Sequence, residues 1–203
     1  MFSRIFRRKI YLDYAAITPV DFKVVKIMQK ISATNWYNPS SLYGSGVKAS
    51  KNLELARKDV AQVLCGKSVH SVHTDEIIFT GGGTESNNLA IQGVLKSWAH
   101  THGQFDVLPH VVISAIEHPS VKKLVEHLVS ENKITASFVG ITEKGLIDMA
   151  ELKEIFQTQK NIILVSIMMV NNELGTIQPM ADIASLIRKY RKGSGTMYPI
   201  FHT

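Results

Sequence analysis

The sequence is poor in cysteine, and it contains no long hydrophobic run. Among its 203 residues Cys65 is the single cysteine, so no disulfide can form within the chain. We therefore expect a reducing compartment, namely the cytoplasm. No apolar run approaches the roughly 20 residues that are needed to span a bilayer, so no membrane partner is expected. The sequence also offers no candidate metal site.

Charge is not segregated along the chain either. The net charge is +6, but the basic residues are scattered among periodic apolar positions and form no stripe interleaved with aromatic residues. We therefore expect no nucleic-acid partner. Arg4, Arg7, Arg8 and Lys9 precede the first expected strand without an apolar signal-peptide core. We interpret residues 1–10 as a solvated basic tail, with a piece of a transit peptide as the alternative.

Internal repeats and low-complexity segments are also absent. The composition, 45% hydrophobic and 20% charged, is typical of a globular α/β chain with a core. Short β-branched runs alternate with segments of helical period, which favours an α/β fold with a mainly parallel sheet and helices on both faces. Strands are expected at residues 76–80, 110–114, 134–139, 161–169 and 198–202. Helices are expected at residues 84–98, after Pro119, after Asp148 and at 180–190.

Two further helices are expected in the first third of the chain. Thr18 would cap the first helix, with Pro19 at the first helical position and Asp21 at the third. A long helix would follow the loop at residues 35–46 and stop at Gly66. The apolar stripes of the two helices comprise Val24, Ile27, Met28 and Ile31 in the first, and Leu53, Ala56, Val60, Val63 and Leu64 in the second.

A glycine-rich segment, residues 80–88, follows one expected strand and opens a helix. This arrangement offers backbone N–H groups and the positive end of a helix dipole to a phosphate, and Thr84 adds a hydroxyl. The segment matches neither the dinucleotide fingerprint nor the lysine-bearing P-loop. The alternative is a glycine turn in which Thr84 is an ordinary N-cap.

Two more polar segments follow expected strands, where open α/β sheets bind ligands. His118 could stack on a flat cofactor or move protons, or it could be an ordinary polar loop residue. Asn171 and Asn172 carry amides that can hydrogen-bond a ligand without adding charge. The alternative for this pair is an Asx turn closed by Gly175.

Taken in order, these segments resemble the class V aminotransferase group of pyridoxal-phosphate (PLP) enzymes, and within it the cysteine desulfurases and selenocysteine lyases. Each motif is weak alone, whereas the ordered set is highly specific and covers nearly the whole chain from about Lys9. The motifs are residues 11–19, which resemble the family's opening strand and turn, Asn38-Pro39-Ser40-Ser41, Ala56-Arg57, residues 79–89, Glu117-His118 and residues 165–175. The resemblance implies the large domain of the fold type I PLP-dependent transferases.

The same resemblance implies PLP as the cofactor and assigns roles to individual residues. Gly83 and Thr84 would bind the PLP phosphate. His118 would stack over the pyridine ring and act as a catalytic residue in proton transfer. Asn172 would lie near the phenolic oxygen of the cofactor and the substrate carboxylate.

Family members continue past the strand at residues 198–203 with an aspartate for the pyridine nitrogen and, later, a Ser-x-His-Lys segment with the Schiff-base lysine. Neither is present in this sequence. Residues 11–203 are therefore interpreted as an N-terminal portion that lacks the lysine segment and the C-terminal small domain, and is inactive alone. Cys65 is expected to pack as a small apolar residue. Tyr43 and Val47 replace a common histidine and arginine, which leaves the subfamily open.

The resemblance implies a cysteine desulfurase that converts L-cysteine to L-alanine and passes sulfur to an enzyme cysteine as a persulfide. Such an enzyme would form a homodimer and supply a sulfur-acceptor protein in iron–sulfur cluster assembly or tRNA thiolation. Two alternatives stay open within the family: a selenocysteine lyase, acting on L-selenocysteine, or another class V aminotransferase. A non-catalytic fragment or interaction module is the alternative of a different class.

Overall fold

The computed structural model describes residues 10–65, 73–102 and 107–203. By its internal contacts the chain divides into two units, Met1–Phe79 and Thr80–Thr203. Residues 1–9, which make up most of the predicted basic tail, and Gly66, the predicted helix stop, lie outside the described residues. The division of the chain into a tail and residues 11–203 therefore stays a prediction.

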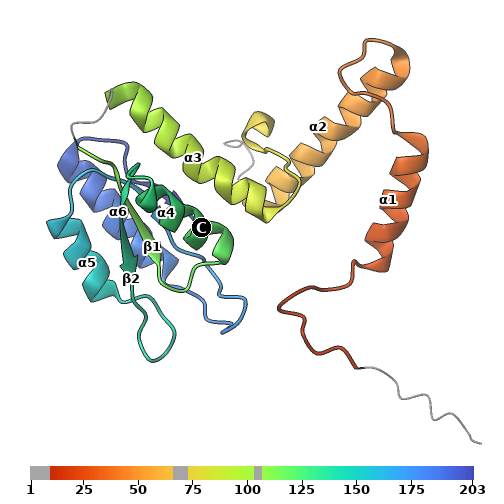
Figure 1. The fold of residues 1–203 in the computed structure, drawn as a ribbon. Coiled ribbons are helices and arrows are strands. Elements are labelled where there is room, and N and C mark those ends of the chain that lie inside the picture. Colours follow the sequence, from red (N-terminus) through yellow and green to blue (C-terminus); the bar gives the residue numbers. More distant parts are fainter. Residues whose placement is uncertain (1–9, 66–72, 103–106) are drawn as a thin grey trace, which may run out of the picture. The chain divides into compact units, whose positions relative to one another are not determined.

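The second unit is built on a parallel sheet (Figure 1). Its strands are β1 (His110–Ser114), β2 (Thr135–Val139), β3 (Ile162–Ser166) and β4 (Ile200–His202). They lie in the order β2-β1-β3-β4, and every neighbouring pair is parallel. The four strands lie within or close to the segments expected from the sequence, and the predicted parallel sheet is confirmed.

Two helices pack on each face of this sheet. Helices α3 (Gly83–His102) and α4 (Pro119–Ser130) cover one face, and α5 (Met149–Thr158) and α6 (Met180–Ser194) cover the other. Because successive side chains of a strand point to opposite faces, Val111 and Ile113 join the core under α3 and α4, whereas Val112 joins the core under α5 and α6. The predicted helices on both faces are thus confirmed.

The start of α5 agrees with the sequence pattern, and the end of α6 does not. Asp148 caps α5, its carboxylate accepting hydrogen bonds from the N–H groups of Ala150 (2.8 Å) and Glu151 (3.1 Å). The helix predicted to end at residue 190 runs on to Ser194. It ends there because Gly195 adopts a left-handed conformation with φ of 67°, which glycine tolerates without strain.

In the first unit, α1 (Phe22–Thr34) and α2 (Gly44–Cys65) are the two predicted helices. The expected cap at Thr18 is wrong: Asp21 caps α1, and its carboxylate accepts from the N–H of Lys23 at 2.7 Å. The apolar stripe of α1 is exposed in the structure, and none of the residues of α1 is buried. Cys65 ends α2, and its side chain lies outside the described part of the chain.

Two strands expected in the first unit do not form. Residues 11–13 lead into a turn in which the carbonyl of Asp13 accepts from the N–H of Ala16. Glu76 ends the 3₁₀ turn η2 (Thr74–Glu76), and residues 77–80 follow it outside any strand, with Ile77 extended and Ile78 64% exposed. A β-branched run becomes a strand only where another strand completes its hydrogen bonds, and among the described residues none does. Instead the Arg57 guanidinium donates to the carbonyl of Ile77.

Candidate functional site

The candidate site lies at the carboxyl ends of β1 and β3, which are neighbours in the sheet. After β1 the chain crosses through α4 on one face, and after β3 it crosses through α6 on the other (Figure 1). The loops that leave the two strands therefore diverge. Such a switch point is where open α/β sheets form their ligand-binding crevice.

Two hydrogen bonds join these loops. Glu117, only 8% exposed, accepts from the N–H of Met168 at 2.6 Å. The amide of Asn171 donates to the carbonyl of Ile116 at 3.2 Å. Burial raises the pKa of Glu117 to about 7, and the hydrogen bond from Met168 offsets part of that effect. The sequence offered one signal for Glu117, an acid just after a buried strand. A chemical role was predicted for the neighbouring His118 only.

The two adjacent asparagines have different surroundings. The side-chain oxygen of Asn171 accepts from the N–H groups of Glu173 (2.9 Å) and Leu174 (2.8 Å), and Gly175 N–H donates to its carbonyl. The Asx-turn alternative is therefore correct for Asn171. The Asn172 side chain is exposed, and no hydrogen bond joins it to another described residue. Asn172 is thus the member of the pair that can bind a ligand.

The glycine loop ends at the first turn of α3. Gly83 is the first residue of the helix and Thr84 the second, so the alternative of Thr84 as an N-cap is wrong. The N–H of Gly81 donates to the Glu85 carboxylate at 2.6 Å, and the hydroxyls of Thr80 and Ser86 are 2.6 Å apart. This hydrogen bond to a side chain of the adjoining helical turn occupies the N–H of Gly81. The exposed first turn of α3, with the Thr84 hydroxyl, fits a phosphate group.

His118 caps α4, and Pro119 is the first residue of that helix. Its Nδ1 atom accepts from the N–H of Ser120 at 3.1 Å and lies 2.8 Å from the Ser120 hydroxyl oxygen. Thr84 and His118 line one hollow of about 440 Å³. The structure thus brings together two of the residues that the sequence singled out, although their segments are more than thirty positions apart.

A further polar pair lies at the ends of β3 and β4. The Ser166 hydroxyl and His202 Nδ1 are 2.8 Å apart, and the Ile167 N–H donates to the carbonyl of His202 at 3.0 Å. Burial lowers the pKa of His202, which favours its neutral form. Sequence reasoning expected a strand here and assigned no role to either side chain. A serine that ends an otherwise apolar strand was the available signal.

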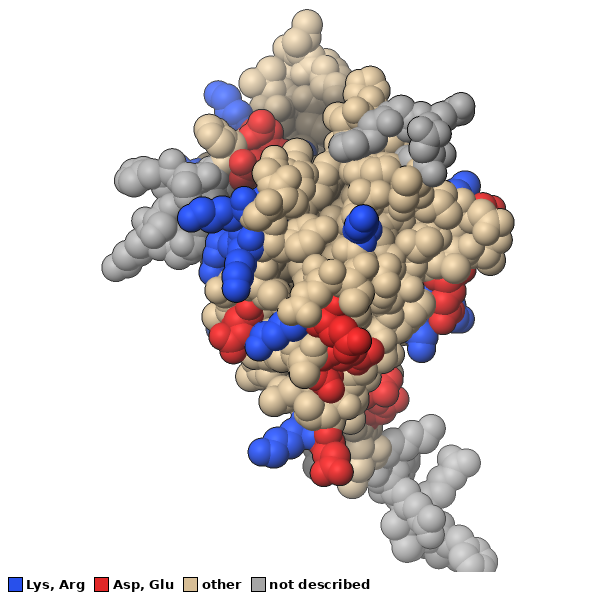
Figure 2. Space-filling model, turned by 90° about the vertical axis from the view of Figure 1, so that its left-hand side faces the viewer, with Lys and Arg blue, Asp and Glu red and all other residues tan. Residues whose placement is uncertain are grey.

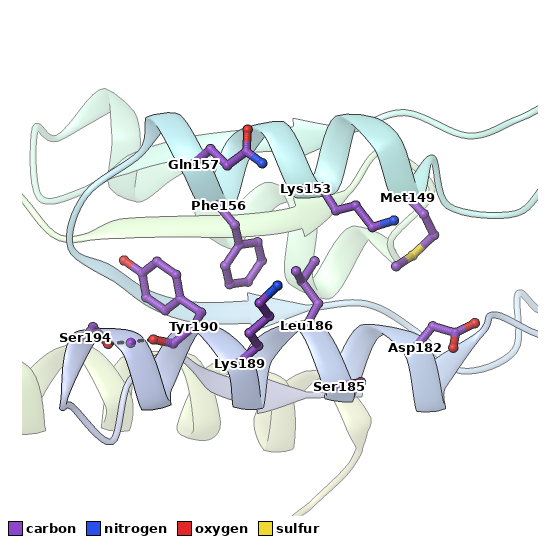
Figure 3. A pocket seen from close by; sticks show the side chains of 11 residues that line it. Met149, Lys153, Phe156, Gln157, Asp182, Ser185, Leu186, Lys189, Tyr190 and Ser194 are labelled. Atoms are coloured by element: carbon purple, nitrogen blue, oxygen red, sulfur yellow. Dashed lines mark hydrogen bonds between the residues drawn. The ribbon is translucent and has the colours of Figure 1, made fainter.

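A larger hollow, of about 810 Å³, lies between α5 and α6. Figure 3 shows Phe156, Leu186 and Tyr190 pointing toward one another there, with Lys153 and Lys189 beside them. The Phe156 and Tyr190 rings meet edge to face, with centroids 5.0 Å apart. None of residues 80–88, His118, Asn171 or Asn172 lines this hollow. The candidate site residues identified from the sequence therefore lie outside it.

The surface is mixed in charge. On the face shown in Figure 2, lysine and arginine side chains are interspersed with aspartate and glutamate. In the described part of the chain, no helix combines the length and the apolar character that crossing a membrane requires.

Comparison with known proteins shows the family of the chain. The model of the Aminotransferase class-V family matches residues 10–194. Selenocysteine lyase of Homo sapiens is 37% identical over 193 residues, which cover 89% of this chain and 42% of that protein. Cysteine desulfurase IscS of Dictyoglomus turgidum is 35% identical over 184 residues, which cover 91% of this chain and 43% of that protein. The chain thus spans less than half the length of these relatives.

Solved structures also match this chain over about half of their own length. A NifS-like protein matches with a TM-score of 0.79 and 31% identity, over 91% of this chain and 47% of that one. SspA in complex with cysteine matches with a TM-score of 0.77 and 32% identity, over 95% of this chain and 49% of that one.

The parallel sheet with helices on both faces is the fold of the class of PLP-dependent enzymes that these structures represent. The chain is a member of the class V aminotransferase family, whose cysteine desulfurases and selenocysteine lyases depend on PLP. The predicted family, fold and cofactor are confirmed. The roles of Gly83, Thr84, His118 and Asn172 remain predictions.

Proposed function

We propose that this chain forms the phosphate-binding and ring-stacking part of the active site of a PLP-dependent cysteine desulfurase. The observation that carries the proposal is the hollow beside the start of α3 and α4 that Thr84 and His118 line together. The similarity to IscS supports this substrate class. PLP, when bound, withdraws electrons from the substrate carbon next to the amino group.

Each candidate residue has a distinct part in the proposal. The N–H groups of Gly83 and Thr84 and the Thr84 hydroxyl bind the phosphate dianion, which the positive end of the α3 dipole also attracts. His118 stacks on the ring and holds or moves a proton. Asn172 donates from its amide to the substrate carboxylate or the phenolic oxygen of the cofactor.

Glu117 holds the two loops that follow β1 and β3 together. Its hydrogen bond to Met168 N–H ties the His118 segment to the loop that carries Asn172. Burial raises the pKa of Glu117 to about 7, which favours its neutral form compared with an exposed glutamate.

The activity itself would belong to a protein of the relatives' full length, in which the residues of this chain would form one part of the site. In that protein L-cysteine would yield L-alanine, and the sulfur would pass to an enzyme cysteine as a persulfide. A homodimer, a sulfur-acceptor protein and a cytoplasmic site of action complete the proposal. A selenocysteine lyase is the second candidate, favoured by the 37% identity to the human enzyme of that name.

Two measurements test the proposal. The DNA that follows the Thr203 codon should continue, in frame or after a frameshift, with an aspartate codon and later a Ser-x-His-Lys segment. The protein expressed from that complete frame should release alanine from L-cysteine, and His118→Ala should lower the rate by about 10² to 10⁴-fold. A stop without such a continuation would favour the non-catalytic alternative. Faster alanine release from L-selenocysteine than from L-cysteine would favour the lyase.

A further inference from the structure

His118 is held by a chain of polar groups that the proposed function does not use. The Asn87 amide, on α3, donates to the Ser120 hydroxyl oxygen at 2.7 Å. That oxygen lies 2.8 Å from His118 Nδ1, and the backbone N–H of Ser120 donates to the same nitrogen at 3.1 Å. Asn87 and Ser120 are 33 positions apart and partly buried, so helix packing brings them together.

The donor and acceptor roles in this chain follow from the chemistry of each group. The Asn87 NH₂ group has only protons to offer, so the Ser120 oxygen accepts there and directs its own proton to His118. The Ser120 backbone N–H is a second donor aimed at the same ring nitrogen. Two donors on Nδ1 require that this atom carries a lone pair. In the neutral ring the proton is therefore on Nε2.

We propose that Asn87 and Ser120 are positioning residues that hold His118 in its Nε2–H form. The inference rests on the proposed function, in which His118 holds or moves a proton, and adds what determines where that proton is. It also links two parts of the site. Asn87 lies one turn after Thr84 on α3, so the helix that would bind the phosphate also orients the histidine.

The test is magnetic resonance of the imidazole nitrogens in the isotope-labelled chain, without cofactor, at a pH where His118 is neutral. The wild-type ring should show a protonated Nε2 and an unprotonated Nδ1. Ser120→Ala removes one hydrogen bond to Nδ1, which should lower the ratio of Nε2–H to Nδ1–H forms about fivefold. Asn87→Ala should lower it less, because the hydroxyl remains, and Ser120→Thr should restore the wild-type ratio.

Ser130→Ala is the matched control. Ser130 is on the same helix, but its hydroxyl donates to the carbonyl of His127 and does not touch His118. A wild-type ring protonated mainly at Nδ1, or a ratio that Ser120→Ala leaves unchanged, would overturn the proposal. The wild-type spectrum alone tests where the proton of His118 is, even if a variant fails to fold. Because no cofactor is present, the outcome is independent of PLP binding, which tests the proposed function separately.

Discussion

The buried carboxyl of Glu117 should make the stability of the second unit depend on pH. Burial raises its pKa from 4.5 to about 7, so the folded chain binds a proton there more tightly than the unfolded chain does. The stability that Glu117 contributes is therefore full below about pH 4 and is lost as the pH rises through about 7. One pKa unit corresponds to about 1.4 kcal/mol, so the loss amounts to about 3 kcal/mol.

Glu117→Gln removes this titration while keeping a side-chain oxygen for Met168 N–H. The free energy of unfolding of the wild type, minus that of the variant, should fall by about 3 kcal/mol between about pH 4 and about pH 8. Burial lowers the pKa of His110 and His202, which destabilises the fold as the pH falls. Both proteins share those two groups, so the difference between them isolates Glu117.

Urea unfolding followed by the fluorescence of Trp98 is the assay. Trp98 is buried in the second unit, and Trp36→Phe in every protein removes the other tryptophan. Glu126→Gln, which changes an exposed carboxylate on α4, is the matched control for the exchange of a glutamate for a glutamine. A difference for Glu117→Gln that changes with pH no more than the difference for this control would refute the reasoning.

Three further results are expected. Asp148→Ala should destabilise the second unit by about 1 kcal/mol in urea unfolding, since it removes the cap of α5; no change would contradict the cap assignment. Leu152→Ala should cost about 2 to 5 kcal/mol in the same assay, because Leu152 is fully buried; a cost below about 1 kcal/mol would contradict its place in the core. Borohydride treatment of this chain with PLP should not attach PLP specifically to any single lysine, as checked by mass spectrometry of the peptides; specific labelling of one lysine would contradict the expectation that the Schiff-base lysine is absent.

The fold of the second unit was predictable because its signals are local. Asp148 precedes an amphipathic segment, and the apolar runs of β1 and β3 are buried on both faces. The strand expected at residues 76–80 failed because strand formation depends on a hydrogen-bonding partner, which a short run of sequence does not specify. Thr18 was predicted as the cap and Asp21 as the third helical residue, whereas the helix begins later and Asp21 is its cap.

For the candidate site, sequence reasoning identified the segments better than the individual groups. Thr84 and His118 were singled out, and they line one hollow. Asn171 and Asn172 looked equivalent, although Asn171 is used in a turn. The roles of Asn87 and Glu117 were missed, because each depends on a contact with a residue more than thirty positions away.

The most direct test of the central claim is a titration of the isotope-labelled chain with pyridoxine phosphate, which lacks the aldehyde of PLP and cannot condense with lysines. Saturable shifts are predicted at the backbone amides of Gly83 and Thr84 and at the His118 ring. Thr84→Ala should weaken binding by about 10- to 100-fold, the usual effect of losing a hydrogen bond to a charged group. An absence of saturable shifts, or shifts confined to the hollow between α5 and α6, would contradict the claim.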